Sequence, residues 1–410
     1  MTAFPIDEVR ARFPALADPA RIYLDCPGGT QVCAPAIRAM VAHLESGTAN
    51  SGGAFRTSIE TDALSDAAHA AMADLLGGDP GEIAFGLNMT SLTLAVSRAL
   101  ARDWREGDEL IVSRLDHDAN VAPWLAVARD VGMVVRRIDF DPETGMLALD
   151  ALPALLGPRT RLVAVGGASN AIGTINDIAA IGRIVRAHSN ALFFVDAVQS
   201  VPHLATDVRS LGCDLLVCSP YKFFGPHQGV LWGRADLLAR LRAYKVRPAS
   251  ADRPARAFET GTPSFEAQAA VLGTIDYLGW LGGVLAPGAP TRRARLLAAM
   301  EGCLAYEQTL GERLLAGARR LNSLRLWGRP AMEGRVPTFG FTSAARTPGA
   351  MAQALADREI YAWSGHFYAI EAIARMGLAE SGGLLRLGLC HYNTADEVDR
   401  TIEALAAIDR

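Results

Sequence analysis

Five short apolar runs, separated by segments with helical spacing, place the strongest constraint on how this chain of 410 residues folds. The runs occupy residues 108–113, 132–138, 160–165, 191–195 and 215–218. Between them, residues 124–131 and 178–188 carry apolar side chains at helical spacing. This alternation is typical of βαβ units, in which a mostly parallel sheet is covered by helices on both faces. Strands buried on both faces are expected to be this apolar, so the pattern predicts an α/β fold.

The chain is longer than one hydrophobic core usually organises, and a division into domains is therefore expected. A stretch rich in glycine and proline, residues 282–291, reads as the boundary. We expect an N-terminal segment over residues 1–20 that packs with the small domain. A large domain would cover residues 21–285, and a small C-terminal domain would cover residues 286–410 and end on a helix over residues 395–408.

Charge and cysteine usage exclude several classes of protein. Forty lysines and arginines face 44 acidic residues, and the resulting net charge of −4 argues against a nucleic acid or an anionic membrane as the main partner. No apolar run has the length of a membrane span, and residues 1–12 lack the apolar core of a signal peptide. The six cysteines are scattered and form no disulfide framework. We therefore expect a reduced, cytoplasmic, globular protein.

Several common functional signatures are missing. The sequence has no glycine-rich dinucleotide fingerprint, no P-loop and no His-Glu-x-x-His motif. Four residues separate Cys213 from Cys218, a loose fit to the tight pairs of zinc sites, and Cys218 falls inside an apolar run. We interpret both cysteines as small core residues and expect no metal site.

Asp196 and Lys222 are the most informative pair of polar residues. Asp196 directly follows the apolar run 191–195, and Lys222 follows the run that begins at Leu215. Both should lie at carboxyl ends of neighbouring strands, where open α/β sheets place their ligands. A structural ion pair between the two side chains is the alternative interpretation.

A helix that begins near Asn88 adds a third feature. Thr90 and Ser91 fall in its first turn, where hydroxyls and free backbone amides can bind a phosphate group. Simple N-capping is the alternative. Taken together, the amine, the carboxylate and the helix N-terminus match the requirements of pyridoxal 5′-phosphate. Lys222 would form a Schiff base with the aldehyde, and Asp196 would hold the pyridinium proton.

The chain resembles the cysteine desulfurase-like, class V aminotransferase group of fold-type I pyridoxal-phosphate enzymes, from Tyr23 to Thr394. The segments that carry the resemblance are Asp116-His117-Asp-Ala-Asn120-Val-Ala-Pro-Trp124, Ser169-Asn170-Ala-Ile-Gly-Thr174, Val195-Asp196-Ala-Val-Gln199, Ser219-Pro-Tyr-Lys222, Gly261-Thr262-Pro263 and Arg386. It implies a large cofactor-binding domain with a mostly parallel seven-stranded sheet and a smaller α+β C-terminal domain.

The resemblance also implies roles for the residues around the cofactor. His117 would stack on the pyridine ring and shuttle protons. Asn170 and Gln199 would form hydrogen bonds with the ring, Gln199 near its phenolic oxygen, and Asn170 would also contact the substrate. Ser219 would bind the phosphate together with Thr90. Ordinary hydrogen bonding in loops and caps is the alternative for Asn170, Gln199 and Ser219.

Two further residues would define the assembly and the substrate. Thr262 resembles the residue that reaches the phosphate of the neighbouring subunit, which implies a homodimer with shared active sites. Ordinary hydrogen bonding in a loop is the alternative for Thr262. Arg386 would bind the α-carboxylate of the substrate through its bidentate guanidinium, whereas a surface ion pair is the alternative.

The sequence departs from the family pattern in one loop. Desulfurases of this type carry an arginine, a small residue, a glycine, commonly two histidines and then the catalytic cysteine. This chain has Trp363 at the arginine position and Tyr368 at the cysteine position, whereas Gly365 and His366 fit. A phenol cannot carry a persulfide, since that step needs a soft thiolate. We expect His366 and Tyr368 to contact the substrate, with a pocket-lining aromatic as the alternative for Tyr368.

Another thiol could replace the missing cysteine. Cys26 lies in the segment Asp25-Cys-Pro-Gly-Gly29, which by resemblance approaches the substrate, and Cys390 follows Arg386 closely. A packing role is the alternative for both cysteines.

These observations favour a pyridoxal-phosphate enzyme that acts on a small amino acid. By resemblance, the first hypothesis is cleavage of a C–S or C–Se bond in cysteine, cystine or selenocysteine, as in a desulfurase or a selenocysteine lyase. Transamination or epimerisation on the same machinery is the alternative, because neither needs a cysteine. A degenerate relative that keeps the fold for partner binding is the alternative outside the enzymes.

Overall fold

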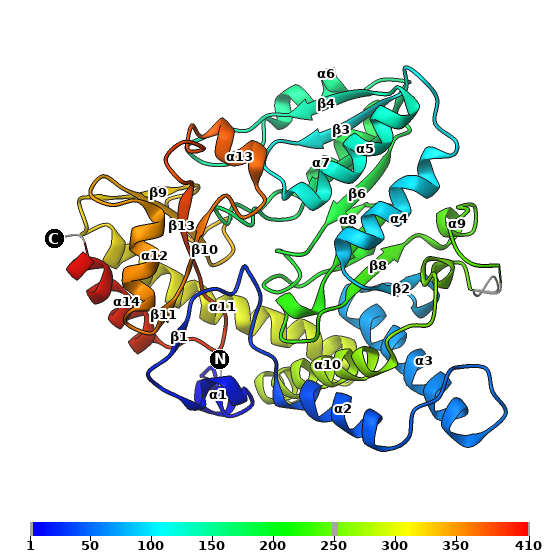
Figure 1. The fold of residues 1–410 in the computed structure, drawn as a ribbon, viewed down its shortest axis with the longest axis horizontal. Helices are drawn as coiled ribbons and strands as arrows, with labels where there is room; N and C mark the ends of the chain where they lie inside the picture. Colours follow the sequence, from blue (N-terminus) through cyan, green and yellow to red (C-terminus); the bar gives the residue numbers. More distant parts are fainter. Residues whose placement is uncertain (1–2, 248–252, 409–410) are drawn as a thin grey trace.

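A seven-stranded sheet forms the centre of the larger part of the molecule in the computed structural model, which describes residues 3–247 and 253–408 (Figure 1). Its strands lie in the order β2-β8-β7-β6-β5-β3-β4. They are β2 (Ile83–Gly86), β3 (Glu109–Ser113), β4 (Val134–Ile138), β5 (Thr160–Gly166), β6 (Leu192–Asp196), β7 (Leu215–Cys218) and β8 (Gly229–Gly233). Strands β3 to β7 pair in parallel, and β8 is antiparallel to both β2 and β7. The mostly parallel seven-stranded sheet expected from the sequence is confirmed.

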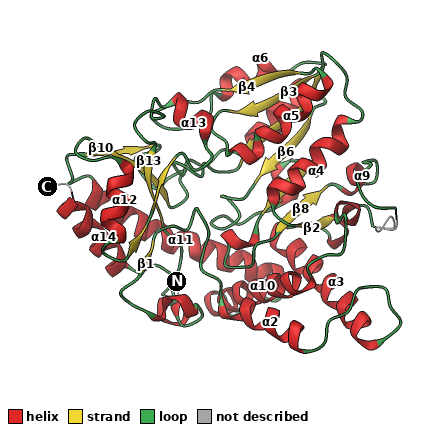
Figure 2. Ribbon diagram, viewed as in Figure 1, coloured by secondary structure: helices red, strands yellow, loops and turns green. Residues whose placement is uncertain are grey.

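Alternate side chains of these strands pack into two separate cores, as the twofold repeat of a strand requires. Leu162, Ala164 and Phe194 face one core, whereas Val163 and Phe193 face the other. The first core includes α4 (Met89–Ala101) and α5 (Ala122–Val131), and the second includes α3 (Arg56–Leu76), α7 (Ile178–His188) and α10 (Phe265–Leu285). Figure 2 shows α4 and α5 alongside the strands, and α3 and α10 below them in the view.

Two long helices connect the sheet to the rest of the chain. Helix α10 packs against α2 (Ala34–Glu45), and α11 (Arg292–Ala318) follows it after a short turn. The sequence pattern does not predict α10, because its buried side chains surround the helix and leave no amphipathic face. Among residues 3–247 and 253–408, no helix is long and apolar enough to cross a membrane.

The C-terminal part contains a second, antiparallel sheet with the strand order β12-β13-β10-β9. Its strands are β9 (Leu324–Trp327), β10 (Thr338–Ser343), β12 (Trp363–Gly365) and β13 (Leu384–Gly388). Helices α11, α12 (Pro348–Ala356) and α14 (Ala395–Ile408) pack against it around a third core. A short helix, α13 (Ile370–Arg375), follows the loop after β12. We call the part around this sheet the small domain and the part around the seven-stranded sheet the large domain.

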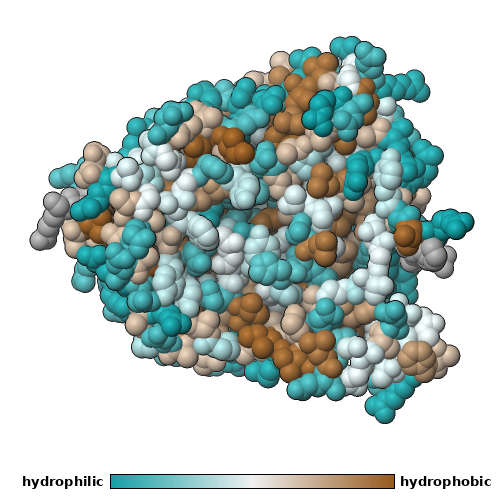
Figure 3. All heavy atoms as spheres, viewed as in Figure 1, coloured by the Kyte–Doolittle hydropathy of each residue, from teal (hydrophilic) through white to brown (hydrophobic). Residues whose placement is uncertain are grey.

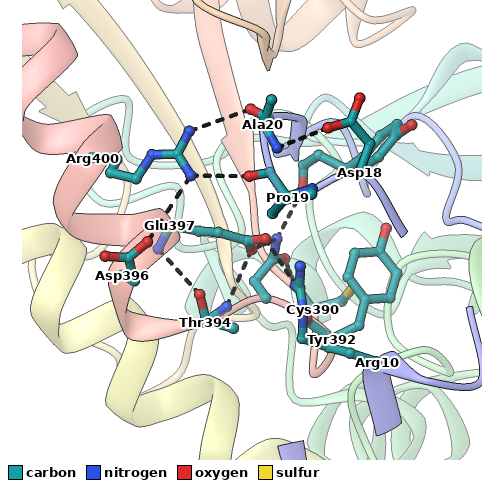
Figure 4. Close-up of polar contacts among 12 residues, drawn as sticks. Arg10, Asp18, Pro19, Ala20, Cys390, Tyr392, Thr394, Asp396, Glu397 and Arg400 are labelled. Atoms are coloured by element: carbon teal, nitrogen blue, oxygen red, sulfur yellow. Dashed lines mark hydrogen bonds and ion pairs between the residues drawn. The ribbon is translucent and has the colours of Figure 1, made fainter. Parts of the chain in front are cut away.

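The N-terminal segment contacts the small domain. Arg10 at the end of α1 (Ile6–Arg10) donates to the Tyr392 carbonyl at 2.8 Å and pairs with Glu397 at 2.8 Å. Arg400 on α14 donates to the carbonyls of Pro19 and Ala20 at 3.1 and 3.3 Å (Figure 4). Further along, β1 (Ile22–Tyr23) pairs in parallel with β11 (Ile360–Tyr361). These contacts hold the first part of the chain against the small domain.

Candidate active site

A cavity of about 280 Å³ lies at the carboxyl ends of β5 and β6, where residues from both domains meet. Open α/β sheets bind ligands at this end because the strands stop there and the loops diverge. The large domain contributes Thr90, Asp116, His117, Asn170, Asp196, Gln199, Tyr221 and Lys222 to its wall. The small domain contributes Trp363, Phe367, Tyr368 and Arg386. Residues from distant parts of the chain therefore face one space.

Lys222 provides a buried amine in this cavity. It lies in the short 3-10 helix that follows β7, and its Nζ donates to the Pro27 carbonyl at 2.5 Å. Burial lowers the pKa of Lys222 to about 7, and the positive charge of Arg386 contributes to this shift. At neutral pH a large fraction of this amine is therefore unprotonated and able to act as a nucleophile or base.

Asp196 ends β6 and is buried beside the same space. One of its carboxylate oxygens accepts the Val198 backbone N–H at 2.9 Å. Burial raises the pKa of Asp196 to about 6. Within the described part of the chain, Asp196 and Lys222 form no ion pair, so the structural salt bridge considered for the two side chains is not present. A cation supplied from outside the chain would stabilise this carboxylate.

A second carboxyl group, that of Asp116, lies close to the first. Asp116 accepts the Gly166 N–H at 2.9 Å and the Asn120 side-chain amide at 2.8 Å. Burial and the nearby charge of Asp196 raise the pKa of Asp116 to about 7. Asp116 was not among the expected site residues, although it begins one of the segments that carry the family resemblance.

His117 presents a neutral imidazole to the cavity. Its Nδ1 accepts the Ala119 N–H at 3.0 Å, so the neutral ring carries its proton on Nε2. Burial lowers the pKa of His117 to about 4, and the charge of Lys222 contributes. The ring centroid lies 5.4 Å from that of Tyr368.

Arg386 supplies the one guanidinium that lines this cavity among the described residues, and it lies on β13. It donates to the Asn170 carbonyl at 3.0 Å, and its guanidinium lies 4.1 Å from the centroid of Phe367. The Asn170 side chain donates to the Phe367 carbonyl at 2.8 Å. These contacts join the large domain to the loop after β12. The surface ion pair considered for Arg386 is not formed within residues 3–247 and 253–408, and the side chain is buried.

The remaining residues expected at the site lie outside the cavity wall. Ser91 takes part in a capping box with Asn88, which accepts the Ser91 N–H at 2.8 Å. His366 is exposed and accepts the Tyr368 N–H at 3.0 Å. Ser219 is buried behind the wall, and Thr262 lies exposed on a different surface groove. Of the residues expected to bind phosphate, Thr90 alone lines the described cavity.

Several buried polar atoms around the cavity have no partner among the described residues. They are Asp25 Oδ1, Asn170 Oδ1, Ser219 Oγ and Arg386 Nε. Each such atom costs about 1–3 kcal/mol when it is left without a hydrogen bond. A polar ligand in the cavity would satisfy the atoms of Asn170 and Arg386, which line its wall, whereas Asp25 and Ser219 do not line it. Together with the free amine of Lys222, this set fits pyridoxal phosphate, which offers an aldehyde, a ring nitrogen and a phosphate.

No thiol lines the cavity in the part of the chain that the structure describes. Cys26 is buried, with its Sγ 3.3 Å from Cys390 Sγ and 3.3 Å from the Tyr392 hydroxyl. Both sulfurs are therefore enclosed in the core between the domains. Residues 3–247 and 253–408 also contain no group of acidic, histidine and cysteine side chains arranged for a metal ion.

Pro27 and Gly28 lie in the segment 25–29, which the resemblance places near the substrate, but neither residue was predicted individually. The Pro27 carbonyl accepts from both Lys222 and Gln199, the latter at 2.9 Å. Gly28 lies so close to Trp363 that a Cβ there would be 2.8 Å from the indole nitrogen. A backbone carbonyl and a glycine carry no recognisable functional pattern, and both positions depend on how the N-terminal segment crosses the site.

Comparison with known proteins gives consistent results. The Aminotransferase class-V family model matches residues 22–401. A probable cysteine desulfurase of Pseudomonas aeruginosa is 31% identical over 412 residues, with 97% of this chain and 96% of that protein covered. The apo structure of a cysteine desulfurase from Thermococcus onnurineus superposes with a TM-score of 0.88 at 24% identity, covering 100% of this chain and 98% of that one. A C-DES mutant with glycine covalently linked to its PLP cofactor superposes with a TM-score of 0.79 at 22% identity, covering 97% and 98%.

Proposed function

The chain belongs to the aminotransferase class-V family, in its cysteine desulfurase-like group of pyridoxal-phosphate enzymes, and we propose that it breaks a C–S or C–Se bond of a free amino acid without using an enzyme thiol. Cysteine, cystine and selenocysteine are the candidate substrates. The observation that carries this proposal is a cavity wall that contains no described cysteine but brings together an amine, a carboxylate, an imidazole, a guanidinium and the start of α4, provided by Lys222, Asp196, His117, Arg386 and Thr90.

Lys222, Asp196 and the N-terminus of α4 would hold the cofactor. Lys222 would bind it covalently through its amine, Asp196 would accept the N–H of the ring, and Thr90 with the first free amides of α4 would bind the phosphate. When bound, pyridoxal phosphate supplies an electron sink for charge that develops at Cα. A buried carboxylate next to the ring nitrogen keeps that nitrogen protonated and so favours this role.

Arg386 and Lys222 would then act on the amino acid. The Arg386 guanidinium would bind the α-carboxylate, which holds Cα close to the Lys222 amine. With a pKa of about 7, this amine is suited to remove the Cα proton near neutral pH. The neutral His117 ring would donate a hydrogen bond from Nε2 to the leaving sulfur, because its Nδ1 already accepts the Ala119 N–H.

Sulfur would leave together with its own substituent in this reaction. With cystine, the Cβ–S bond breaks, the electron pair goes to sulfur, and uptake of one water gives cysteine persulfide, pyruvate and ammonium. Cysteine would give sulfide in the same way, and selenocysteine would give selenide. No step requires a cysteine of the enzyme, which agrees with Tyr368 at the position where desulfurases carry one.

Transamination or epimerisation is the second candidate. The observation that favours it is the presence of two proton-carrying groups, Lys222 and His117, in one cavity. Both reactions begin with removal of the same Cα proton. They differ from C–S cleavage in their second step, because a proton is added to the substrate or the cofactor and the Cβ–S bond stays intact.

The products formed from cysteine, cystine and selenocysteine test the proposal. We expect pyruvate with persulfide, sulfide or selenide. Lys222→Ala should lower the rate by about 10²–10⁴-fold, because the base is lost. Cys26→Ser should leave the rate within about a factor of two, since its sulfur is enclosed in the core.

Other products would indicate other reactions. Alanine together with sulfide, lost in Cys26→Ser, would overturn the thiol-free proposal. A keto acid with the cofactor left as pyridoxamine would support transamination, and exchange of the Cα proton with inversion would support epimerisation.

A further inference from the structure

Two large aromatic rings stand exposed at the mouth of the catalytic cavity. Trp363 is 54% exposed and Tyr368 is 64% exposed, and both line the cavity. Exposed aromatic rings that line a cavity offer a large apolar surface to a bound ligand. The small-domain wall of the cavity thus carries these two rings together with the Arg386 guanidinium, whereas Lys222 belongs to the large-domain wall.

The position of Trp363 connects this apolar rim with the carboxylate-binding group. In the β12–β13 pair, Trp363 is directly opposite Arg386, so both side chains lie on the same face of the small sheet. The indole leans on the turn that contains Gly28, where the absence of a Cβ allows this approach. A substrate carboxylate on Arg386 would thus have the indole beside it.

Tyr368 is held on the other side of the mouth by a strained loop. Phe367 and Tyr368 both have positive φ angles, 52° and 57°, which residues other than glycine rarely adopt. Two interdomain hydrogen bonds maintain this conformation, from the Asn170 side chain to the Phe367 carbonyl and from the Asp118 N–H to the Tyr368 carbonyl at 2.7 Å. Strain of this kind persists where the surroundings impose it, and here it places a phenol ring beside His117.

The positive charge inside the cavity disfavours a cationic substituent between Trp363 and Tyr368. Aromatic faces can bind cations, but Arg386 lies opposite Trp363 in the β12–β13 pair and would repel a positively charged substituent. Trp363 and Tyr368 themselves offer no cation for an anionic substituent. A neutral apolar group is the occupant that this rim fits.

We propose that the enzyme acts on cysteine thioethers whose sulfur carries an aromatic or other large apolar group, held between Trp363 and Tyr368. This inference rests on the proposed C–S cleavage and names its substrate class. Lys222 would take the Cα proton, the Cβ–S bond would break, and its electron pair would leave on sulfur, which is then protonated. With one water, the thioether R–S–CH2–CH(NH3⁺)–COO⁻ gives R–SH, pyruvate and ammonium.

Competing probes test the substrate class. We expect the holoenzyme to process S-benzyl-L-cysteine with a kcat/KM at least about tenfold above that for S-methyl-L-cysteine, a difference of the size that a filled apolar pocket supplies. Trp363→Ala and Tyr368→Ala should each reduce this ratio about tenfold. Trp363→Phe and Tyr368→Phe keep a ring and should retain most of it. Val134→Ala, on the exposed edge of β4, is the control and should leave the ratio unchanged.

A binding measurement locates the aromatic group independently of turnover. S-(4-nitrobenzyl)-L-cysteine should quench tryptophan fluorescence in Lys222→Ala supplied with cofactor. This quenching should be absent in the double variant that carries both Lys222→Ala and Trp363→Phe.

Different results would contradict the thioether inference and the proposed function. Turnover of cystine with no preference for the benzyl compound, or quenching that persists without Trp363, would overturn the thioether inference and leave the proposed function intact. Turnover of none of these amino acids would overturn both.

Discussion

At the residue scale, burial determines the chemistry of the site more than ion pairing does. Lys222 has a backbone carbonyl as its hydrogen-bond partner, and desolvation shifts its pKa down, whereas desolvation shifts the pKa of Asp196 up. Both shifts favour the neutral form, as expected when a group is removed from water without a counter-ion. The Lys222 amine is thus able to react with the aldehyde of a ligand, and the Asp196 carboxylate is able to pair with a ring N–H.

The low pKa of Lys222 should determine the pH at which the apoenzyme takes up its cofactor. Only the neutral amine attacks an aldehyde, and the neutral fraction of Lys222 increases as pH rises through about 7. The rate of pyridoxal phosphate uptake should therefore rise through this range and level off above about pH 8. Stopped-flow absorbance measures this rate. An ordinary lysine would still show a rising rate near its usual pKa of 10.5.

Removal of the neighbouring charge provides a control for this pH profile. Arg386→Leu removes a cation that lowers the pKa of Lys222, so the rise should move to higher pH. Arg358→Leu, a change of an exposed arginine in the small domain, should not move it. A midpoint that stays in place in Arg386→Leu would contradict the electrostatic explanation.

At the element scale, local periodicity predicts the amphipathic and the fully buried segments well. Helix α7, strand β7 and helix α14 begin and end where the sequence pattern places them. The pattern gives no sign of α10. A helix that is apolar on all sides carries no 3.6-residue signal, and its identity depends on the helices that surround it.

One buried arginine holds several elements of the small domain to the site. Arg335 is 0% exposed, and its guanidinium donates to the carbonyls of Ile172 at 2.6 Å, Thr338 at 2.8 Å and Trp327 at 3.1 Å. It also donates to the Arg329 carbonyl. Ile172 is close in the chain to Asn170, so this arginine supports the loop that contacts Arg386.

Replacement of Arg335 should therefore destabilise the protein strongly. Arg335→Met leaves several buried carbonyls without donors, and we expect the apparent free energy of unfolding to fall by about 3 kcal/mol or more. Arg335→Lys should recover only part of this loss, because a single ammonium cannot reach all the carbonyls. Urea denaturation measures both, with exposed Arg320→Met as the control. Equal stability of Arg335→Met and the unaltered protein would contradict this role.

At the scale of the whole molecule, the cavity forms where the large domain, the small domain and the N-terminal segment meet. Thr262, expected from the resemblance to contact a neighbouring subunit, lies on a separate groove with Leu87, which is 79% exposed. Further apolar side chains of α2, including Ile37, Val41 and Leu44, are also exposed. Figure 3 shows apolar surface low in the view, where α2 lies in Figure 1. We propose that a second copy of the chain covers the groove that contains Thr262.

This proposal predicts a homodimer that depends on Leu87. Leu87→Glu replaces the exposed apolar side chain of this groove with a charge and should shift the sedimentation coefficient from that of a dimer to that of a monomer. The monomer should bind pyridoxal phosphate more weakly, because Thr262 would no longer reach the phosphate of the partner. Glu301→Gln, an exposed change on α11, is the control. A monomeric unaltered protein with full cofactor affinity would contradict the proposal.

The sequence by itself determined the alternation of strands and helices in the large sheet, the place of Asp196 at a strand end with Lys222 shortly after the next strand, and the lack of a cysteine at position 368. These features are local, because strand and helix periods and motif spacing are written in neighbouring residues. The tertiary structure alone decided that Cys26 and Cys390 face each other in the core, that the Pro27 carbonyl meets Lys222, and that Trp363 stands opposite Arg386. Contacts between segments far apart in the chain depend on the packing of two domains and leave no pattern in either segment.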